Sequence, residues 1–257
     1  MKPSDAARPG NDRVVVVLAA MPRELHPLVR RLGLRAATAG GMRAWRGDGV
    51  VAAAVGVGPD RAGSGTARVL EEVPARRVIV TGVAGAVGPT LKVGDLVHPA
   101  TVVDTRSATV RTPSAPSTVG SRVGLLATVG RVHLEGSVRR GTRGRDGSDE
   151  LPEGTTAVDM ETAAIAAASE AKGVPWDVVR AVSDVAGTLT PEIASLLRPD
   201  GRADAAATAR VLVRNPRLLG PLVRLGLDTA RATRVATAAV ISELATAGVR
   251  PASRRRG

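Results

Sequence analysis

Short apolar runs separated by helical patterns dominate the amino-terminal half of the chain. The unbroken β-branched run Val14–Ala19 is typical of a strand buried on both faces of a sheet. Val50–Val55 and Arg77–Thr81 repeat that pattern. Helices are predicted from Pro22, a residue that suits a first helical turn, to about Leu32, and over Ala62–Val73. This alternation of strand and helix indicates right-handed crossovers within one sheet.

The second half of the chain mixes predicted loops with regular elements. Val93–Val103 is expected to hold a pair of strands. Ser, Thr and Pro are frequent over 106–120, and glycine and charged residues over 139–154, so both segments are predicted loops. Alanine and isoleucine periodicity predicts a helix over 158–172. Trp176–Val182 again has the pattern of a buried strand.

The carboxyl-terminal pattern is helical from Pro191 to Ala247, with breaks at Pro199-Asp200-Gly201 and Asn215-Pro216. The fold class predicted from all these elements is a three-layer α/β/α domain with a mixed central sheet and a helical carboxyl-terminal extension. The expected organisation is a disordered tail at 1–13, one domain at 14–250 that includes the helical extension at 187–250, and a basic tail at 251–257.

Length and composition agree with one sizeable core. The chain has 257 residues, of which 44% are hydrophobic. No apolar run approaches the roughly 18 residues of a membrane span, so we expect a cytoplasmic protein without stable membrane insertion. The absence of cysteine excludes disulfides, thiolate catalysis and cysteine-based zinc sites. His26, His98 and His133 lack the spacing of metal ligands, so no metal is expected.

The formal net charge of +12 raises the question of a nucleic-acid partner. Only three of the basic residues are lysines, and the abundance of arginine beside alanine, valine and glycine is typical of coding bias. The chain has two Trp and no Phe or Tyr. Because single strands and RNA are bound on aromatic platforms, no nucleic-acid partner is expected.

Three segments after the first predicted strands are candidates for ligand contact. Glu24, in Ala20-Met21-Pro22-Arg23-Glu24, follows the first strand at the edge where open α/β sheets bind ligands. A glutamate is also what the helix dipole favours in a first turn. Val55–Ala62 and Thr81–Gly88 are rich in small residues, which allow a backbone to approach an anion or a sugar, or simply to turn tightly.

A pair of carboxylates gives the most specific pattern. Glu161, in Ala157–Ala164, opens a predicted helix, and Asp184, in Val179–Ala186, ends a predicted strand. Either one alone is common at such a position. Cleavage of an N-glycosidic bond needs an acid for the leaving base, groups that hold the sugar, and a nucleophile at the anomeric carbon. Together with Glu24, the two carboxylates are candidates for those roles.

From Val14 to Gly187 the sequence resembles the 5′-methylthioadenosine/S-adenosylhomocysteine nucleosidases and their phosphorylase relatives. The resemblance implies that Asp184 protonates or hydrogen-bonds the purine and that Glu24 orients or deprotonates the attacking water. It also implies an adenine nucleoside as the small-molecule substrate, no cofactor, and a homodimer in which the neighbouring subunit completes the pocket.

The same resemblance implies the ribose contacts. The family's valine-glutamate-methionine-glutamate segment appears here as Val158-Asp159-Met160-Glu161, with one glutamate shortened to aspartate. Met160 is expected to pack on the ribose and Glu161 to bind its hydroxyls. Asp159 and Ser183 are also expected among the substrate-binding residues.

The sequence departs from the family in two places. The family's glycine-serine-alanine-glycine turn reads Gly82-Val83-Ala84-Gly85, so Val83, Ala84 and Gly85 are expected beside the substrate without the serine hydroxyl. The serine-glycine-aspartate-phenylalanine stretch, whose ring stacks on the base, is missing before the ribose segment. Base stacking must then come from an aliphatic side chain or be absent.

These departures also resemble the hopanoid-associated phosphorylase branch, which is thought to release adenine from a bulky lipid nucleoside. Thr128–Val132 and Arg198–Arg202 carry this second resemblance, together with the long helical carboxyl terminus. An apolar helical extension would suit such a ligand, and it would equally suit an ordinary core.

Several functions therefore stay open. Glu24 favours hydrolysis. Phosphorolysis, including that of an adenosyl lipid, needs a cationic phosphate pocket, for which Arg23, Arg43 and Arg61 are the candidates. A non-catalytic nucleoside- or lipid-binding module would fit the presence of Val83 and the missing aromatic ring. A short-chain dehydrogenase is suggested by glycine spacing, but that chemistry usually depends on a tyrosine, which the chain lacks.

Overall fold

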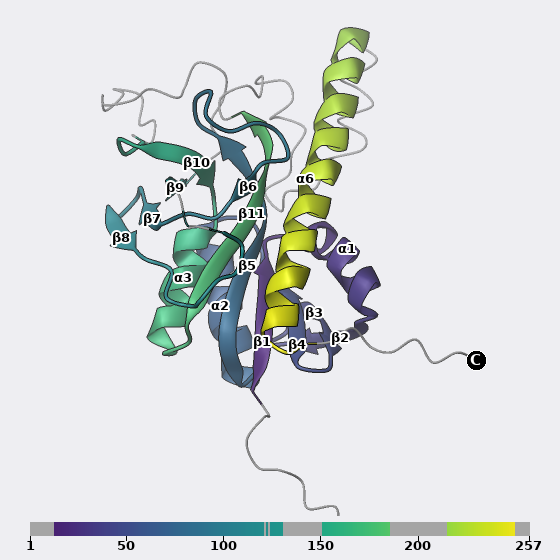
Figure 1. Ribbon diagram of the computed structural model, residues 1–257, viewed down its shortest axis with the longest axis vertical. Helices are drawn as coiled ribbons and strands as arrows, with labels where there is room; N and C mark the ends of the chain where they lie inside the picture. The colour runs from purple at the N-terminus through teal and green to yellow at the C-terminus, as the bar shows by residue number, and fades with distance from the viewer. Residues whose placement is uncertain (1–12, 121, 123, 131–150, 186–214, 250–257) are drawn as a thin grey trace, which may run out of the picture.

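The computed structural model describes residues 13–120, 122, 124–130, 151–185 and 215–249 (Figure 1). The predicted tails, apart from Arg13, lie outside the described residues. So do most of the predicted loop at 139–154 and the extension up to residue 214, which includes the segment 198–202.

The described strands form one mixed sheet in the order β2-β3-β4-β1-β5-β10-β9-β7-β8, and β11 pairs with β5 and β6 beside this path. The central strands β4, β1, β5 and β11 are parallel; the pairs β3–β4 and β7–β8 are antiparallel, as is the short pairing of β10 with β5. The strands are β1 (Val14–Ala19), β2 (Arg35–Ala39), β3 (Met42–Gly47), β4 (Val50–Ala54), β5 (Ala75–Ala86), β6 (Leu96–Val97), β7 (Thr101–Asp104), β8 (Thr109–Arg111), β9 (Leu125–Thr128), β10 (Thr155–Asp159) and β11 (Trp176–Val185).

Helices cover both faces of this sheet, with α1 and α6 on one face and α2 and α3 on the other (Figure 1). Side chains along β1 alternate between the two layers, so that Val15 and Val17 pack in the cluster of α1 and α6, and Val16 and Leu18 in that of α2 and α3. The predicted three-layer fold is confirmed. The helices are α1 (Pro22–Leu32), α2 (Pro59–Glu72), α3 (Thr162–Ala171) and α6 (Leu219–Thr246).

Strand β5 corrects the expectation for the third small-residue segment. The predicted strand Arg77–Thr81 continues to Ala86, so most of Thr81–Gly88 is strand and not a tight turn. The residues from Val78 to Ala86 pair in parallel with β11. Glycine and alanine weaken a strand because they offer little side-chain packing, but backbone pairing with β11 along this stretch compensates here.

A hairpin at one edge of the sheet was missed from the sequence. Strands β2 and β3 pair antiparallel around Gly40 and Gly41, whose φ angles are +55° and +72°. Most side chains of both strands are exposed or only half-buried, so the segment has no clear apolar alternation. Strands β8 and β9 were also missed; β8 lies inside the predicted loop at 106–120.

Two other predictions need correction. Val93–Val103 does contain two strands, but β6 pairs with β11 and β7 with β8 and β9, so the two do not pair with each other. The helix predicted from residue 158 begins only at Thr162, because Thr155–Asp159 forms β10. A short apolar run before a helix does not distinguish strand from helix by periodicity alone.

The helical carboxyl terminus is confirmed within the described residues. A short 3-10 helix, Pro216–Leu218, follows the predicted break and leads into α6. All buried residues of α6 lie from Ala232 onward. The carboxyl-terminal half of α6 therefore packs on the sheet beside α1, whereas the amino-terminal half extends past it (Figure 1).

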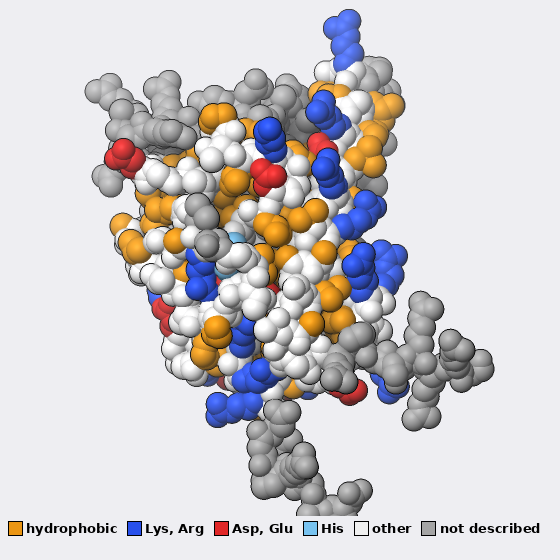
Figure 2. All heavy atoms as spheres, in the orientation of Figure 1, with side chains coloured by type: hydrophobic (Ala, Val, Ile, Leu, Met, Phe, Trp, Pro, Cys, Tyr) orange, Lys and Arg blue, Asp and Glu red, His pale blue; other side chains and the backbone are white. Residues whose placement is uncertain are grey.

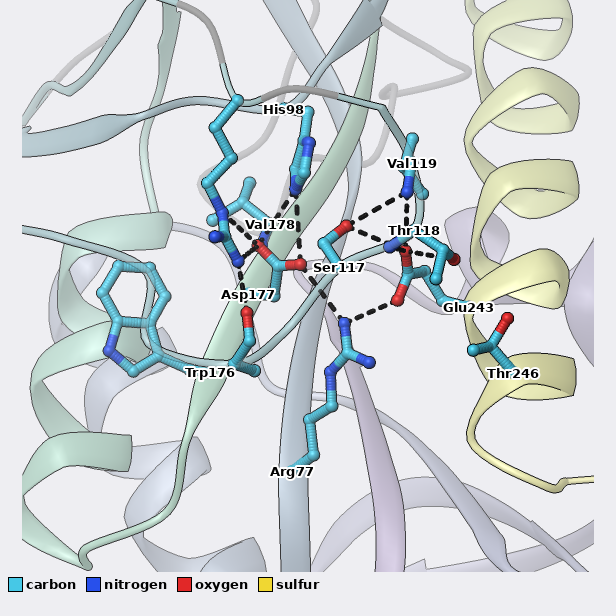
Figure 3. A network of polar contacts seen from close by, with 12 residues as sticks. Arg77, His98, Ser117, Thr118, Val119, Trp176, Asp177, Val178, Glu243 and Thr246 are labelled. Atoms are coloured by element: carbon cyan, nitrogen blue, oxygen red, sulfur yellow. Dashed lines mark hydrogen bonds and ion pairs between the residues drawn. The ribbon is translucent and has the colours of Figure 1, made fainter.

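A buried carboxylate fastens that packed half of α6 to the sheet (Figure 3). The Glu243 side chain has no exposed surface and lies 2.7 Å from the Arg77 guanidinium of β5. It also accepts hydrogen bonds from the Ser117 hydroxyl at 2.8 Å, the Thr118 hydroxyl at 2.9 Å and the Val119 amide at 2.9 Å. Glu243 thus connects α6, the loop after β8 and the central strand.

Asp177, at the start of β11, extends the same network. Its fully buried carboxylate lies 3.2 Å from Arg77, 3.1 Å from Arg122 and 3.3 Å from His98. Buried charges are tolerated only when they are paired and hydrogen-bonded, and both carboxylates meet that condition. Burial alone would raise the pKa of Glu243, but hydrogen bonds from Thr118 and its neighbours outweigh this effect and lower that pKa to about 2.

Replacing Glu243 by alanine is expected to lower the free energy of unfolding by about 3–5 kcal/mol at neutral pH, because Arg77 would lose a buried partner. Glu71→Ala, which removes an exposed ion pair with Lys172, should cost less than about 1 kcal/mol. Urea unfolding of the three proteins measures both values.

The advantage of the wild-type chain over Glu243→Ala should also depend on pH. Because the folded-state pKa is depressed, this stabilisation is fully present above the ordinary value of 4.5 and is lost as the pH falls toward about 2. An advantage that is equal at neutral pH and at about pH 3 would contradict this account.

Candidate active site

The site is built around a gap in the pairing of β5. On one side of β5, β1 pairs as far as Val80, and β10 begins to pair only at Gly85. The residues between them have no described strand neighbour on that side, so their backbone groups need side-chain partners. The amide N–H of Val83 donates to Glu24 Oε1 at 3.2 Å, and the Val83 carbonyl accepts from the Arg180 guanidinium at 2.8 Å.

Glu24 reaches this gap from the first turn of α1. Pro22 at the start of the helix and the backbone bond from the Met21 amide to Glu24 Oε2, 2.9 Å long, fix the direction of the side chain. The carboxylate is buried. Burial raises the pKa of Glu24 above its usual range, although the positive charge of Arg180 acts in the opposite direction. A buried carboxyl with a raised pKa is suited to accepting a proton near neutral pH.

Arg180 is the cation at the centre of the site, and the sequence analysis gave it no role. It lies in β11 and is almost fully buried. Its guanidinium contacts Asp159 Oδ2 at 2.7 Å, Glu161 Oε2 at 3.9 Å and Thr162 Oγ1 at 3.1 Å. The available signal was a single arginine within the apolar run Val178–Val182 of a predicted buried strand, because a buried guanidinium requires carboxylate partners.

Glu161 occupies the N-cap of α3, and its carboxylate points back to the start of α2. Its Oε1 accepts a hydrogen bond from the Gly58 amide at 2.8 Å. In the glycine-rich segment Val55–Ala62, the Gly58 N–H that was expected to face a ligand anion or sugar therefore binds a carboxylate of the protein. Burial, followed by the charge of Asp159, raises the pKa of Glu161 to about 7.

Asp159 is held entirely by protein groups. Oδ1 accepts from the Thr128 hydroxyl at 2.7 Å, and Oδ2 accepts from the Thr162 amide at 3.0 Å and from the Thr162 hydroxyl. Its ion pair with Arg180 completes the set. Asp159 thus orients Arg180, and its expected contact with the substrate stays a prediction.

Asp184 lies near the end of β11 beside the same gap. A β-bulge places Ser183 as an extra residue, so that Asp184 pairs with Gly85, which also pairs with Val158 on β10. The side chain is half-buried, and the Ser183 hydroxyl donates to it. Burial raises the pKa of Asp184, so the carboxyl keeps its proton to a higher pH than an exposed aspartate does.

Three other residues that were predicted to contact the substrate lie in or beside hydrophobic clusters of the domain. Val83 is half-buried and packs against a small cluster formed by Ala181 of β11 with Ala232 and Ala236 of α6. The Ala84 side chain belongs to the main hydrophobic core, so it does not face the gap. Met160 is half-buried and packs beside the small cluster that contains Val158.

A cavity of about 390 Å³ lies next to the carboxylate cluster formed by Glu24, Asp159 and Glu161. Its wall contains Met21 and Gly56 from the two turns that hold Glu24 and Glu161. The same wall contains Arg23, Arg43 and Arg61, so the structure brings together the three arginines proposed from the sequence. Its described lining does not include the carboxylates. The full set of lining residues is Ala20, Met21, Pro22, Arg23, His26, Arg43, Ala54, Gly56, Val57 and Arg61.

Comparison with known proteins connects this geometry to a family. Residues 14–129 match the family described as the Phosphorylase superfamily. A 5′-methylthioadenosine/S-adenosylhomocysteine nucleosidase from Actinobacillus succinogenes is 36% identical over 158 residues, which cover 54% of this chain and 69% of the relative. The chain belongs to the phosphorylase superfamily. Its members include nucleosidases and nucleoside phosphorylases, so the chain is an enzyme that acts on nucleosides, as the sequence resemblance implied.

Solved structures agree with this placement at the level of the fold. A 5′-methylthioadenosine/S-adenosylhomocysteine nucleosidase from Helicobacter pylori aligns with a TM-score of 0.65 at 16% identity, covering 92% of this chain and 100% of that one. A futalosine hydrolase from the same organism aligns with a TM-score of 0.64 at 16% identity, covering 91% of this chain and 98% of that one.

Among the described residues, no group of His, Asp and Glu side chains is arranged to hold a metal ion. No helix in the described part of the chain is both long and apolar enough to cross a bilayer.

Substitution of Gly82 by alanine tests the packing of the site. Gly82 has a φ of +133°, and a Cβ there would lie 2.5 Å from Glu24 Oε1 and 3.1 Å from the Arg180 guanidinium. The substitution should displace Glu24 and lower nucleoside turnover about 100-fold, because a small misplacement of a reacting group is costly.

Gly63→Ala on α2 is the matched control, since its new Cβ would meet its nearest neighbour at an ordinary 3.6 Å. Steady-state kinetics, with circular dichroism to verify folding, compare the two variants. Wild-type turnover in Gly82→Ala would show that Glu24 need not occupy this position.

Proposed function

We propose that this enzyme hydrolyses the N-glycosidic bond of an adenine nucleoside. The supporting observation is the convergence of Glu24 and Arg180 on the unpaired stretch of β5, with Glu161 beside Arg180 and with Asp184 on the neighbouring strand β11. The relative at 36% identity is a nucleosidase whose name gives two adenine nucleosides as substrates. A single water is consumed in this reaction, and free base and free sugar are released.

Asp184 supplies the proton that the departing base needs. Negative charge accumulates on the purine ring as its bond to the sugar breaks, and a carboxylic acid that donates to a ring nitrogen stabilises it. The raised pKa of Asp184 keeps that proton available, and the Ser183 hydroxyl fixes the carboxyl in position.

Glu24 orients the attacking water and accepts its proton. As the sugar becomes oxocarbenium-like, water attacks its anomeric carbon and must lose a proton. Glu24 accepts that proton, and its raised pKa makes it a stronger base than an exposed glutamate. Its bonds to the Met21 and Val83 amides fix the direction in which its carboxylate faces.

Glu161 holds the ribose hydroxyls, with Met160 against the sugar. The Gly58 amide occupies Oε1 of Glu161 at 2.8 Å, whereas the contact of Oε2 with Arg180 is long, at 3.9 Å. Oε2 is therefore the oxygen proposed to accept from a hydroxyl. Asp159 is a positioning residue in this proposal. Its carboxylate orients the guanidinium of Arg180, which lies near both Glu24 and Glu161.

Phosphorolysis is the second candidate, and the arginine-lined cavity favours it. Three guanidinium groups around one cavity next to the carboxylate cluster would suit a phosphate nucleophile. An adenosyl lipid remains a candidate substrate for this version of the reaction. Both versions share the acid and the sugar contacts and differ in the group that attacks the anomeric carbon.

Asp184→Asn should lower turnover about 10²- to 10⁴-fold, because an amide can donate a hydrogen bond but is too weak an acid to protonate the base. Release of free adenine from methylthioadenosine, S-adenosylhomocysteine and adenosine measures the effect. Asp60→Asn makes the same chemical change at a surface position and provides the control, since the Asp60 side chain is 92% exposed. Near-normal turnover in Asp184→Asn would remove this residue from the acid role, and no adenine release by the wild-type chain would contradict the proposed substrate.

Phosphate separates the two reactions. Hydrolysis predicts adenine release at full rate in phosphate-free buffer, with free ribose as the second product. The double variant Arg23→Gln with Arg43→Gln should then keep its rate in the presence and absence of phosphate. A rate that requires phosphate, yields a sugar 1-phosphate and falls in the double variant would establish phosphorolysis instead.

A further inference from the structure

An exposed apolar row lies on the amino-terminal half of α6. Leu219, Val223 and Leu227 are 54%, 53% and 66% exposed. Their spacing of four residues places them along one side of the helix, over about 12 Å. Large apolar side chains that line up on an unpacked surface mark interaction sites more often than isolated ones do.

Arginines border this row. Arg217, Arg224, Arg231 and Arg234 are all exposed, and residues 217–234 contain these four arginines against one acid, Asp228. The pair between Arg224 and Asp228 is long, at 3.8 Å, and the Arg224 side chain is 86% exposed. Figure 2 shows basic side chains along α6 with hydrophobic side chains next to them near its upper end.

Charge decides between the occupants of such a surface. A second copy of the chain would bring two arginine-bordered rows together in a protein of net charge +12, and this repulsion opposes a symmetric contact. An anionic bilayer matches both features of this surface. Its headgroups attract the guanidinium groups, and the boundary with its acyl chains accommodates the aliphatic side chains.

We propose that the amino-terminal half of α6 docks the protein on the surface of an anionic lipid bilayer. Leu219, Val223 and Leu227 enter the boundary between headgroups and acyl chains, and the bordering arginines contact lipid phosphates. This is contact with a surface and not a membrane span. The carboxyl-terminal half of α6 stays packed on the sheet, so docking requires no unfolding of the domain.

Co-sedimentation of the full chain with vesicles tests the proposal. Binding is expected to vesicles of equal parts phosphatidylcholine and phosphatidylglycerol, and not to phosphatidylcholine alone, and it should weaken in high salt. Replacing Leu219, Val223 and Leu227 together by serine should reduce binding at least about tenfold. Val110→Ser, at a 63% exposed position on β8, is the apolar control and should bind normally.

Charge controls follow the same design. Arg224→Gln with Arg231→Gln should weaken binding, whereas Arg30→Gln with Arg31→Gln, an equal loss of charge from exposed positions on α1, should not. Circular dichroism and turnover of a soluble nucleoside verify that each variant is folded, and this readout is separate from the vesicle result.

Three results would overturn the proposal: no binding to the anionic vesicles, equal binding to both vesicle types, or unchanged binding of the triple serine variant. Concentration-dependent dimerisation that the serine variant abolishes would also overturn it, because the row would then be an interface between copies.

Discussion

The unpaired stretch of β5 is the constraint from which the site follows. Strand β1 ends before β10 begins, and a buried backbone cannot leave its amide and carbonyl groups without partners. Val83 meets this requirement with a carboxylate on one group and a guanidinium on the other. Glu24 and Arg180, distant in sequence, thereby reach the same place, and Asp159 and Glu161 follow because a buried guanidinium needs anions around it.

Two buried acidic clusters occupy opposite ends of the central strands and illustrate how environment decides role. Near the start of β5 and β11, Asp177 and the α6 residue Glu243 are surrounded by hydrogen-bond donors, which lower the pKa of each carboxyl. These two carboxylates stay ionised and hold the elements together. At the other end, Arg180 faces several acids at once, and burial raises the pKa of Glu24 and Glu161. Carboxyls with raised pKa values in a cluster are typical of reaction sites.

The sequence was informative where one pattern had one physical meaning. Val14–Ala19 is apolar and β-branched enough to indicate a buried strand, and Glu24, Glu161 and Asp184 lie at the ends of elements, as their positions in the pattern indicated. The hairpin β2–β3 was missed because its stability comes from pairing with β4 and from two glycines, without an apolar pattern. Arg180 was missed because its importance arises from partners that only the fold brings near.

Val83 links the carboxyl-terminal helix to the chemistry of the site. Its side chain packs against the cluster of Ala181 from β11 with Ala232 and Ala236 from α6, while its amide donates to Glu24. Because protein interiors are close-packed, a shift of α6 relative to the sheet would be felt at Val83 and, through its amide, at Glu24. Insertions, deletions and swaps of the last helix between related proteins are consequently expected to disturb the backbone contact of Val83 with Glu24 as well as the packing of the domain.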